Sequence, residues 1–277
     1  MNKSESYKAL IQKVREKYKV RHTYGSITLT GIDDILGTDY MGINLYTYWQ
    51  GIDFSDTTPN IKYMVVAQDW GSIAEIDNDF MNRIKAINNG KLNIPYINSC
   101  RQKEKGFPTD NNLIKLFCQL GYGVEGKESI AEKRYPELFF TNFCLGYRIG
   151  KSSGDMPKKL MMQDAELFHD LCVILEPENI LCLGKLTFSC VYESLTGAKA
   201  TQLKGFSSRY NHFIRNHDDI LVQCNDSKIR LHPLAHCGKM GILNRNRLYT
   251  NGKWSTNSSL DNQLEDWRIV AQTSQKG

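Results

Sequence analysis

Polar and charged side chains follow the ends of short apolar runs in this sequence. Asp69 comes after the run at residues 62–67, and its carboxylate could activate a water molecule. Asn142 ends the run at 138–142, and its amide offers the donor and acceptor that reading a pyrimidine edge requires. Both residues also have a structural interpretation, because Asp commonly caps a helix or turn and Asn commonly ties down a turn.

Two histidines follow in the last such segment. His232 and His236 stand in the sequence Leu-His-Pro-Leu-Ala-His-Cys-Gly at residues 231–238, which opens a glycine-rich loop. Histidine can exchange or donate a proton near neutral pH, although a lone histidine is more often a satisfied core residue. The third run ends at Gly184, which we interpret as structural, since glycine permits close approach of the backbone.

The elements that must position these residues alternate between strand and helix patterns. Strands are expected at 62–67, 138–142 and 179–184, and as a last pair at 219–224 and 228–233. Helices are expected at 110–120, 158–175 and 185–196, each long enough to connect parallel strands. The sequence therefore predicts an α/β fold of three layers, α/β/α, around a central four-stranded, mainly parallel sheet. Ligands of such sheets bind beyond the carboxyl ends of the strands, where the polar residues above are expected to converge.

The N-terminal part of the chain has a different pattern. Apolar residues at helical spacing predict an amphipathic helix over residues 5–19, followed by a turn-rich, aromatic segment up to residue 59. We expect residues 1–59 to form an extension packed on the core, and residues 60–277 to form one α/β domain. The extension could cover a sheet edge, shape the pocket or bind a partner.

Composition narrows the class of protein. The 277 residues are 41% hydrophobic, enough for a real core, and no apolar stretch resembles a signal peptide or a membrane span, so a cytoplasmic protein is expected. The eight cysteines form no C-x-x-C pair, which argues for reduced, buried thiols and against a zinc ribbon or cluster. The formal charge of +5 is compatible with a polyanionic partner but is lower than that of a dedicated nucleic-acid binder.

Taken in order, these segments resemble the motifs of the uracil-DNA glycosylase superfamily over roughly residues 60–250. Residues 64–71, Met-Val-Val-Ala-Gln-Asp-Trp-Gly, resemble its first motif, written GQDPY in one branch. Residues 139–142, Phe-Phe-Thr-Asn, resemble the strand with the base-reading asparagine, and residues 175–184 resemble its helix, proline, strand and Leu-Gly segment. The last segment resembles the H-P-S motif in either of two registers, so His236 is the first choice for the catalytic histidine and His232 the second.

The resemblance implies the fold of that superfamily and a DNA glycosylase activity that acts on a base flipped out of the duplex. Asp69 would orient water and stabilise the sugar cation, and the histidine would stabilise negative charge on the departing base. Phe107 would stack on the base that Asn142 binds. The base-binding residues implied in full are Gln68, Trp70, Gly71, Phe107 and Asn142.

The resemblance also implies DNA as the partner of a monomeric protein, with no metal and no cofactor. The loop after His236 would press on the DNA backbone, and an apolar tip such as Met240 could enter the gap left by the flipped base. A solvated loop with scattered charges would look similar in sequence. The basic residues expected to meet phosphates are Lys151, Lys239, Arg245 and Arg247.

Two residues of the first motif depart from the family. Trp70 replaces a proline, and Gly71 stands where strict uracil enzymes carry a bulky tyrosine that excludes 5-substituted pyrimidines. The sequence therefore predicts excision of uracil or a 5-modified pyrimidine, for repair or for defence against phage. Two alternatives stay open: a DNA-binding or sensing protein that kept the fold without catalysis, and a hydrolase of free nucleosides or RNA.

Overall fold

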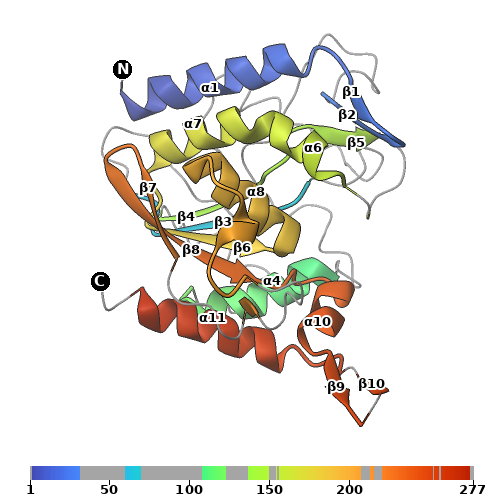
Figure 1. The fold of residues 1–277 in the computed structure, drawn as a ribbon. Coiled ribbons are helices and arrows are strands. Elements are labelled where there is room, and N and C mark those ends of the chain that lie inside the picture. The colour runs from blue at the N-terminus through green and yellow to red at the C-terminus, as the bar shows by residue number, and fades with distance from the viewer. Residues whose placement is uncertain are drawn as a thin grey trace.

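The apolar runs of the sequence form the strands of one central sheet (Figure 1). A computed structural model describes residues 2–31, 60–69, 108–122, 137–149, 154, 156–206, 213–214, 220–251, 253–255 and 257–274. The sheet has five strands in the order β4-β3-β6-β8-β7. The strands are β3 (Tyr63–Ala67), β4 (Leu138–Asn142), β6 (Asn179–Leu183), β7 (Ile220–Cys224) and β8 (Ser227–Leu234).

Within the described ranges the sheet is mostly parallel, as predicted, but it has five strands instead of the four expected. β4, β3, β6 and β8 run parallel, and β7 pairs antiparallel with β8 at the edge. The difference arises because both members of the last predicted pair join the sheet as a hairpin, which turns at Asn225 with a φ of 49°. β3, β4 and β6 are buried along their whole length, which explains their continuous apolar runs, since a parallel sheet is covered on both faces.

Helices cover both faces of the sheet and make two separate apolar cores (Figure 1). On one face, α1, α7 and α8 pack against residues such as Met64, Ile180 and Leu231. On the other face, α4 and α11 pack against residues such as Val65 and Leu183. The helix bounds are α1 (Lys3–Lys17), α4 (Pro108–Gln119), α7 (Ala165–Leu175), α8 (Lys185–Thr196) and α11 (Asp261–Thr273). The protein is therefore an α/β protein with a mostly parallel sheet flanked by helices.

The helix expected at 158–175 is divided into three parts. It consists of α6 (Lys158–Met161), a 3-10 turn η2 (Met162–Asp164) and α7. A second 3-10 turn, η3 (Ala200–Gln202), follows α8. The interruption at η2 turns the Asp164 side chain inward, where it is fully buried.

The N-terminal helix begins earlier than the apolar spacing predicts, because Asn2 caps it. The Asn2 side chain accepts a hydrogen bond from the Glu5 backbone N–H at 2.8 Å, and the Glu5 carboxylate accepts one from the Asn2 backbone N–H at 3.2 Å. α1 lies along α7 (Figure 1). After it, β1 (His22–Tyr24) and β2 (Ile27–Thr30) form a three-stranded antiparallel sheet with β5 (Tyr147–Ile149), a pairing that the sequence did not suggest.

A short helix and a hairpin follow the last strand of the central sheet. α10 (Lys239–Arg245) leads into β9 (Leu248–Thr250) and β10 (Lys253–Ser255), which extend beyond α10 and away from the central sheet (Figure 1). In the ranges that the structure describes, no helix has the length and apolar character needed to cross a bilayer.

The order of the strands creates a switch point between β3 and β6. In the described chain, α4 follows β3 on one face of the sheet, whereas α8 follows β6 on the other face. Chain segments that leave neighbouring parallel strands toward opposite faces open a crevice at the carboxyl ends of those strands. Asp69 lies two residues beyond the carboxyl end of β3, next to this switch point.

Candidate functional site

Gln68 and Arg148 both contact the Asp69 carboxylate at the carboxyl end of β3. Oδ2 accepts a hydrogen bond from Gln68 Nε2 at 2.7 Å and forms an ion pair with Arg148 Nη2 at 2.8 Å. The side chains of Asp69 and Arg148 are only 7% and 3% exposed. Arg148 is fixed in turn, since its Nη1 donates to the Gly154 carbonyl at 2.6 Å. A charge-assisted contact away from water strongly constrains the direction of the carboxylate.

Arg148 was not among the residues singled out from the sequence. It lies on β5, whose pairing with β2 brings a distant part of the chain next to Asp69. In the sequence, its only signal is a position shortly after a strand that ends in a candidate polar residue. Within the described part of the chain, Arg148 Nε is buried and has no hydrogen-bond partner.

Asn142 is the last residue of β4 and stands opposite Ala67 in the parallel register. The chain continues along β3, because the backbone N–H groups of Phe143 and Cys144 donate to the carbonyls of Ala67 and Gln68 at 2.9 and 3.0 Å. Asn142 is 3% exposed, and among the described residues its Oδ1 has no hydrogen-bond partner. A buried amide oxygen in this state costs free energy unless a ligand or water supplies the donor.

His236 follows β8 and presents a hydrogen-bond donor. Its Nδ1 accepts a hydrogen bond from the Gly238 backbone N–H at 3.0 Å, so the neutral ring carries its proton on Nε2. Burial lowers the pKa of His236 below its ordinary value, and the Asp69 carboxylate partly opposes this by raising it. The two side chains therefore lie within electrostatic reach of each other, and the imidazole is held neutral.

Three elements fix the loop that carries His236. From α11, Gln263 Nε2 donates to the His236 carbonyl at 3.0 Å. From α4, Asn112 Nδ2 donates to the Cys237 carbonyl at 2.8 Å. In α10, a Cβ on Gly241 would lie 1.8 Å from the His236 carbonyl oxygen, so only glycine allows this approach.

The structure separates His232 from this group. His232 lies within β8, and its Nε2 is 3.0 Å from Asn179 Oδ1 at the amino end of β6. Asn179 also donates to the Lys62 carbonyl at 3.1 Å and accepts from Ser274 Oγ at 3.0 Å. His232 thus contributes to a buried link between the sheet and the end of α11, whereas His236 lies with Asp69.

The residues assigned to DNA contacts divide into two groups. Lys239, Arg247 and Met240 are exposed on and after α10, with Met240 67% exposed. Arg245 is instead 6% exposed and donates from Nε and Nη2 to the two carboxylate oxygens of Asp266, at 2.6 and 2.7 Å. Contrary to the sequence-based assignment, Arg245 attaches α10 to α11 and does not belong to the exposed basic surface.

Four of the predicted site residues cannot be placed. Trp70, Gly71, Phe107 and Lys151 lie outside the described residues. Gln68, predicted to bind the base, directs its amide nitrogen at Asp69.

Other reactive groups near the site are engaged or protonated. Burial, together with the carboxylates of Asp164 and Asp69, raises the pKa of the Cys144 thiol well above its usual range, so this thiol is a poor nucleophile. Among the residues that the structure describes, no three His, Cys, Asp or Glu side chains are grouped to hold a metal ion.

Comparison with models of known protein families finds no match for this chain, and no curated protein matches it. The site residues and their geometry therefore have to support any statement about function.

Proposed function

We propose that this protein is a DNA glycosylase of the uracil-DNA glycosylase superfamily, which hydrolyses the N-glycosidic bond of a flipped-out uracil or 5-modified pyrimidine. The observation that carries the proposal is the buried Oδ1 of Asn142, which lacks a partner among the described residues, on the strand next to Asp69. We also propose that the fold is that of this superfamily, with the site at the carboxyl ends of the parallel strands.

The base would be recognised through its Watson–Crick edge. Uracil presents an N3–H donor and a neighbouring carbonyl acceptor, and the amide of Asn142 offers the complementary acceptor and donor. Substituents at C5 leave this edge unchanged. Because Asn142 is 3% exposed, a base reaches it only after leaving the duplex stack.

His236 would stabilise the leaving base. As the glycosidic bond breaks, negative charge grows on the pyrimidine carbonyl oxygen, and a fixed N–H donor stabilises that charge. The neutral ring, with its proton on Nε2, is suited to this role, because the Gly238 backbone N–H occupies Nδ1. The lowered pKa of His236 keeps the ring in this form.

Asp69 would act on the sugar and on water. Bond cleavage leaves positive charge on the sugar, which the carboxylate stabilises while orienting the water that adds to the anomeric carbon. The water proton is released, and the base departs with the bonding electrons. Gln68 and Arg148 both bind Oδ2 and so fix the direction of the carboxylate.

The DNA duplex would lie against α10. Lys239 and Arg247 are exposed there and provide cations for the phosphates, together with Lys151 outside the described residues. Met240 is 67% exposed at the start of the helix and provides an apolar wedge.

The experiment is an abasic-site assay with the purified protein. Oligonucleotides with uracil, thymine, 5-hydroxymethyl or glycosylated pyrimidines are incubated and then cleaved with alkali at abasic sites. We expect cleavage of at least one substrate, and a loss of about 10²–10³-fold or more in Asp69→Asn and Asn142→Ala. Arg268→Ala, on the exposed surface of α11, is the control and retains activity. Strict preference for uracil would refute the proposed acceptance of 5-modified pyrimidines. The absence of abasic sites with every substrate would refute the proposed glycosylase activity.

A DNA-binding protein without catalysis is the second candidate. It is favoured by the buried ion pair between Asp69 and Arg148, since a carboxylate oxygen bound to a guanidinium is less available to orient water. Duplex binding by a wild-type protein that forms no abasic sites would select this candidate.

A further inference from the structure

The chain between Asn142 and Arg148 is short and forms the link between two site residues. We call residues 143–146 the site loop. At its start, Phe143 and Cys144 donate their backbone N–H groups to the carbonyls of Ala67 and Gln68. After its end, β5 carries Arg148 to Asp69. The position of this loop therefore determines whether the guanidinium reaches the carboxylate.

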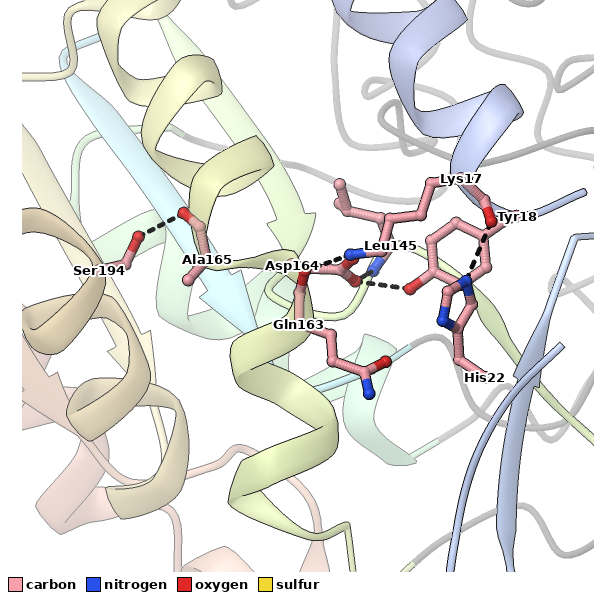
Figure 2. A network of polar contacts seen from close by, with 8 residues as sticks. All are labelled: Lys17, Tyr18, His22, Leu145, Gln163, Asp164, Ala165 and Ser194. Carbon is pink, nitrogen blue, oxygen red and sulfur yellow. Dashed lines mark hydrogen bonds and ion pairs between the residues drawn. The ribbon is translucent and has the colours of Figure 1, made fainter. Parts of the chain in front are cut away.

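A buried carboxylate holds the site loop from the opposite side. Asp164 is fully buried in η2, and its Oδ2 accepts a hydrogen bond from the Leu145 backbone N–H at 2.8 Å (Figure 2). The same oxygen accepts from the Tyr18 hydroxyl at 2.6 Å, and Oδ1 pairs with Lys17 Nζ at 2.6 Å. Tyr18 and Lys17 both belong to the end of α1. One carboxylate thus connects the N-terminal helix to the loop.

The N-terminal segment also contacts the site loop at Gly146 and pairs with β5 after the loop. The ring of Tyr18 lies against Gly146, where a Cβ would be only 2.2 Å from Cε1 of the ring. β2 pairs with β5 so that Leu29 stands opposite Arg148. Burial and the charge of Asp164 raise the pKa of Tyr18, which keeps its hydroxyl protonated as the donor.

We propose that Tyr18 and Asp164 are positioning residues of the site: they hold the site loop so that Arg148 fixes the carboxylate of Asp69. The N-terminal segment is then part of the site's construction. Neither residue touches the reacting atoms. The expected effect on base removal rests on the proposed function, whereas the expected effect on the position of the site loop does not.

Matched variants distinguish the positioning of the site loop from the general attachment of α1 to α7. Asp164→Asn and Tyr18→Phe weaken the link to the site loop. Asp170→Asn is the control. Asp170 of α7 binds Lys13 of α1 at 2.7 Å, so it connects the two helices without contacting the site loop. Tyr18→Phe keeps the ring and its packing, so it provides a folded variant if Asp164→Asn is unstable.

The first measurement uses two buried cysteines as reporters in the full chain. Cys144 lies in the site loop and Cys182 lies in β6, and both are fully buried. Labelling by N-ethylmaleimide is followed peptide by peptide with mass spectrometry. We expect Cys144 to react about 10-fold faster or more in Asp164→Asn and Tyr18→Phe, with Cys182 unchanged, because only the loop opens. Asp170→Asn should behave like the wild type.

The second measurement is the single-turnover rate of base removal beside the affinity for the same DNA. A displaced Arg148 should lower the rate about 10- to 100-fold in both variants and leave the Kd within about 2-fold. The proposal is overturned if Cys144 stays as protected as in Asp170→Asn, if both cysteines open together, or if the rate is unchanged while Cys144 opens. If the wild type removes no base, the proposed function fails, and selective opening of Cys144 still decides whether these residues hold the loop.

Discussion

At the scale of single residues, His236 shows how a loop can set the protonation state of a side chain. The Gly238 N–H occupies Nδ1, and burial disfavours the charged ring. Both effects favour the neutral form, while the nearby Asp69 carboxylate favours the charged form. The balance lies on the neutral side, which is the side that a hydrogen-bond donor to a leaving base requires.

This balance predicts the pH dependence of activity and stability. Because the pKa of folded His236 lies below the ordinary value of about 6.5, base removal should persist below that pH and fall only as pH drops through the folded value. The stability that His236 contributes is fully present above about pH 6.5. It is lost as the pH falls from there through the folded pKa, since the unfolded chain takes up the proton first. Asp69→Asn should lower the pKa of His236 further. Titration of the ring by NMR measures both values, and a folded value at or above 6.5 would contradict the assignment.

Asn142 and Asn179 offer a comparison between two buried amides. Asn142→Leu should change the free energy of unfolding by less than about 1 kcal/mol, because Oδ1 has no described partner to lose, yet it should abolish base removal. Asn179→Leu should cost about 1–3 kcal/mol or more, because it removes the side chain that binds the Lys62 carbonyl and His232 Nε2. Urea unfolding of both variants measures the difference. Equal losses would mean that Asn142 is structural.

The sequence indicated some of these residues better than others. Asp69, Asn142 and His236 stand at or just after the ends of apolar runs, so the general behaviour of parallel sheets was enough to select them as candidates for one edge of the sheet. Arg148 could not be found in this way, because its contact with Asp69 depends on the pairing of β5 with β2. Arg245 was assigned to the DNA-binding surface because the sequence around a basic residue in a loop-like segment does not show that it pairs with a buried carboxylate such as Asp266.

At the scale of elements, the placement of α10 depends on its attachment to α11. Arg245 and Asp266 form a bidentate pair in which the side chains are 6% and 9% exposed. Gln263 of α11 holds the loop just before α10. α11 therefore supports both the histidine and the exposed basic surface that follows it.

Two arginines on this part of the molecule should differ sharply when they are removed. Arg245→Ala should destabilise the fold by about 3–5 kcal/mol, since it removes the bidentate guanidinium from the buried Asp266 carboxylate. Arg268→Ala should leave the stability close to that of the wild type, because its pair with Glu265 is exposed on both sides. Guanidinium unfolding measures both. A stable Arg245→Ala that binds DNA weakly would instead favour a phosphate contact.

Elements were more predictable than their pairings. Periodicity located the strands β3, β4 and β6 and the helices α4 and α8 to within a few residues, because burial on one or two faces leaves a regular pattern. It did not divide the helix at 158–175, where the buried Asp164 interrupts the regular turns. It also could not show that β1 and β2 join β5, because strand partners distant in sequence leave no local pattern.

At the scale of the whole molecule, the proposed DNA surface occupies one side. The charge of +5 is modest, so a few exposed cations on the α10 side should account for much of the salt dependence of binding. α1 lies on the other side of the central sheet (Figure 1). Cations on the two helices should therefore differ in their effect.

Paired substitutions can test this asymmetry. Lys239→Ala with Arg247→Ala should weaken binding to every duplex alike and reduce the slope of log affinity against log salt by about 2, one for each lost phosphate contact. Lys13→Ala on α1 should leave the slope unchanged. Fluorescence anisotropy across a salt series measures both, and equal slopes in the wild type and the double variant would place the duplex elsewhere.

The position of α1 on the outer layer opposite α10 has a practical consequence (Figure 1). A fusion partner or surface tether at the start of the chain projects from the side of the sheet that faces away from Met240. Immobilised or fused forms attached there leave the proposed DNA-binding surface open. The same attachment acts on the helix that precedes Tyr18, whose hydroxyl binds Asp164, so it loads the contact that we propose holds the site loop.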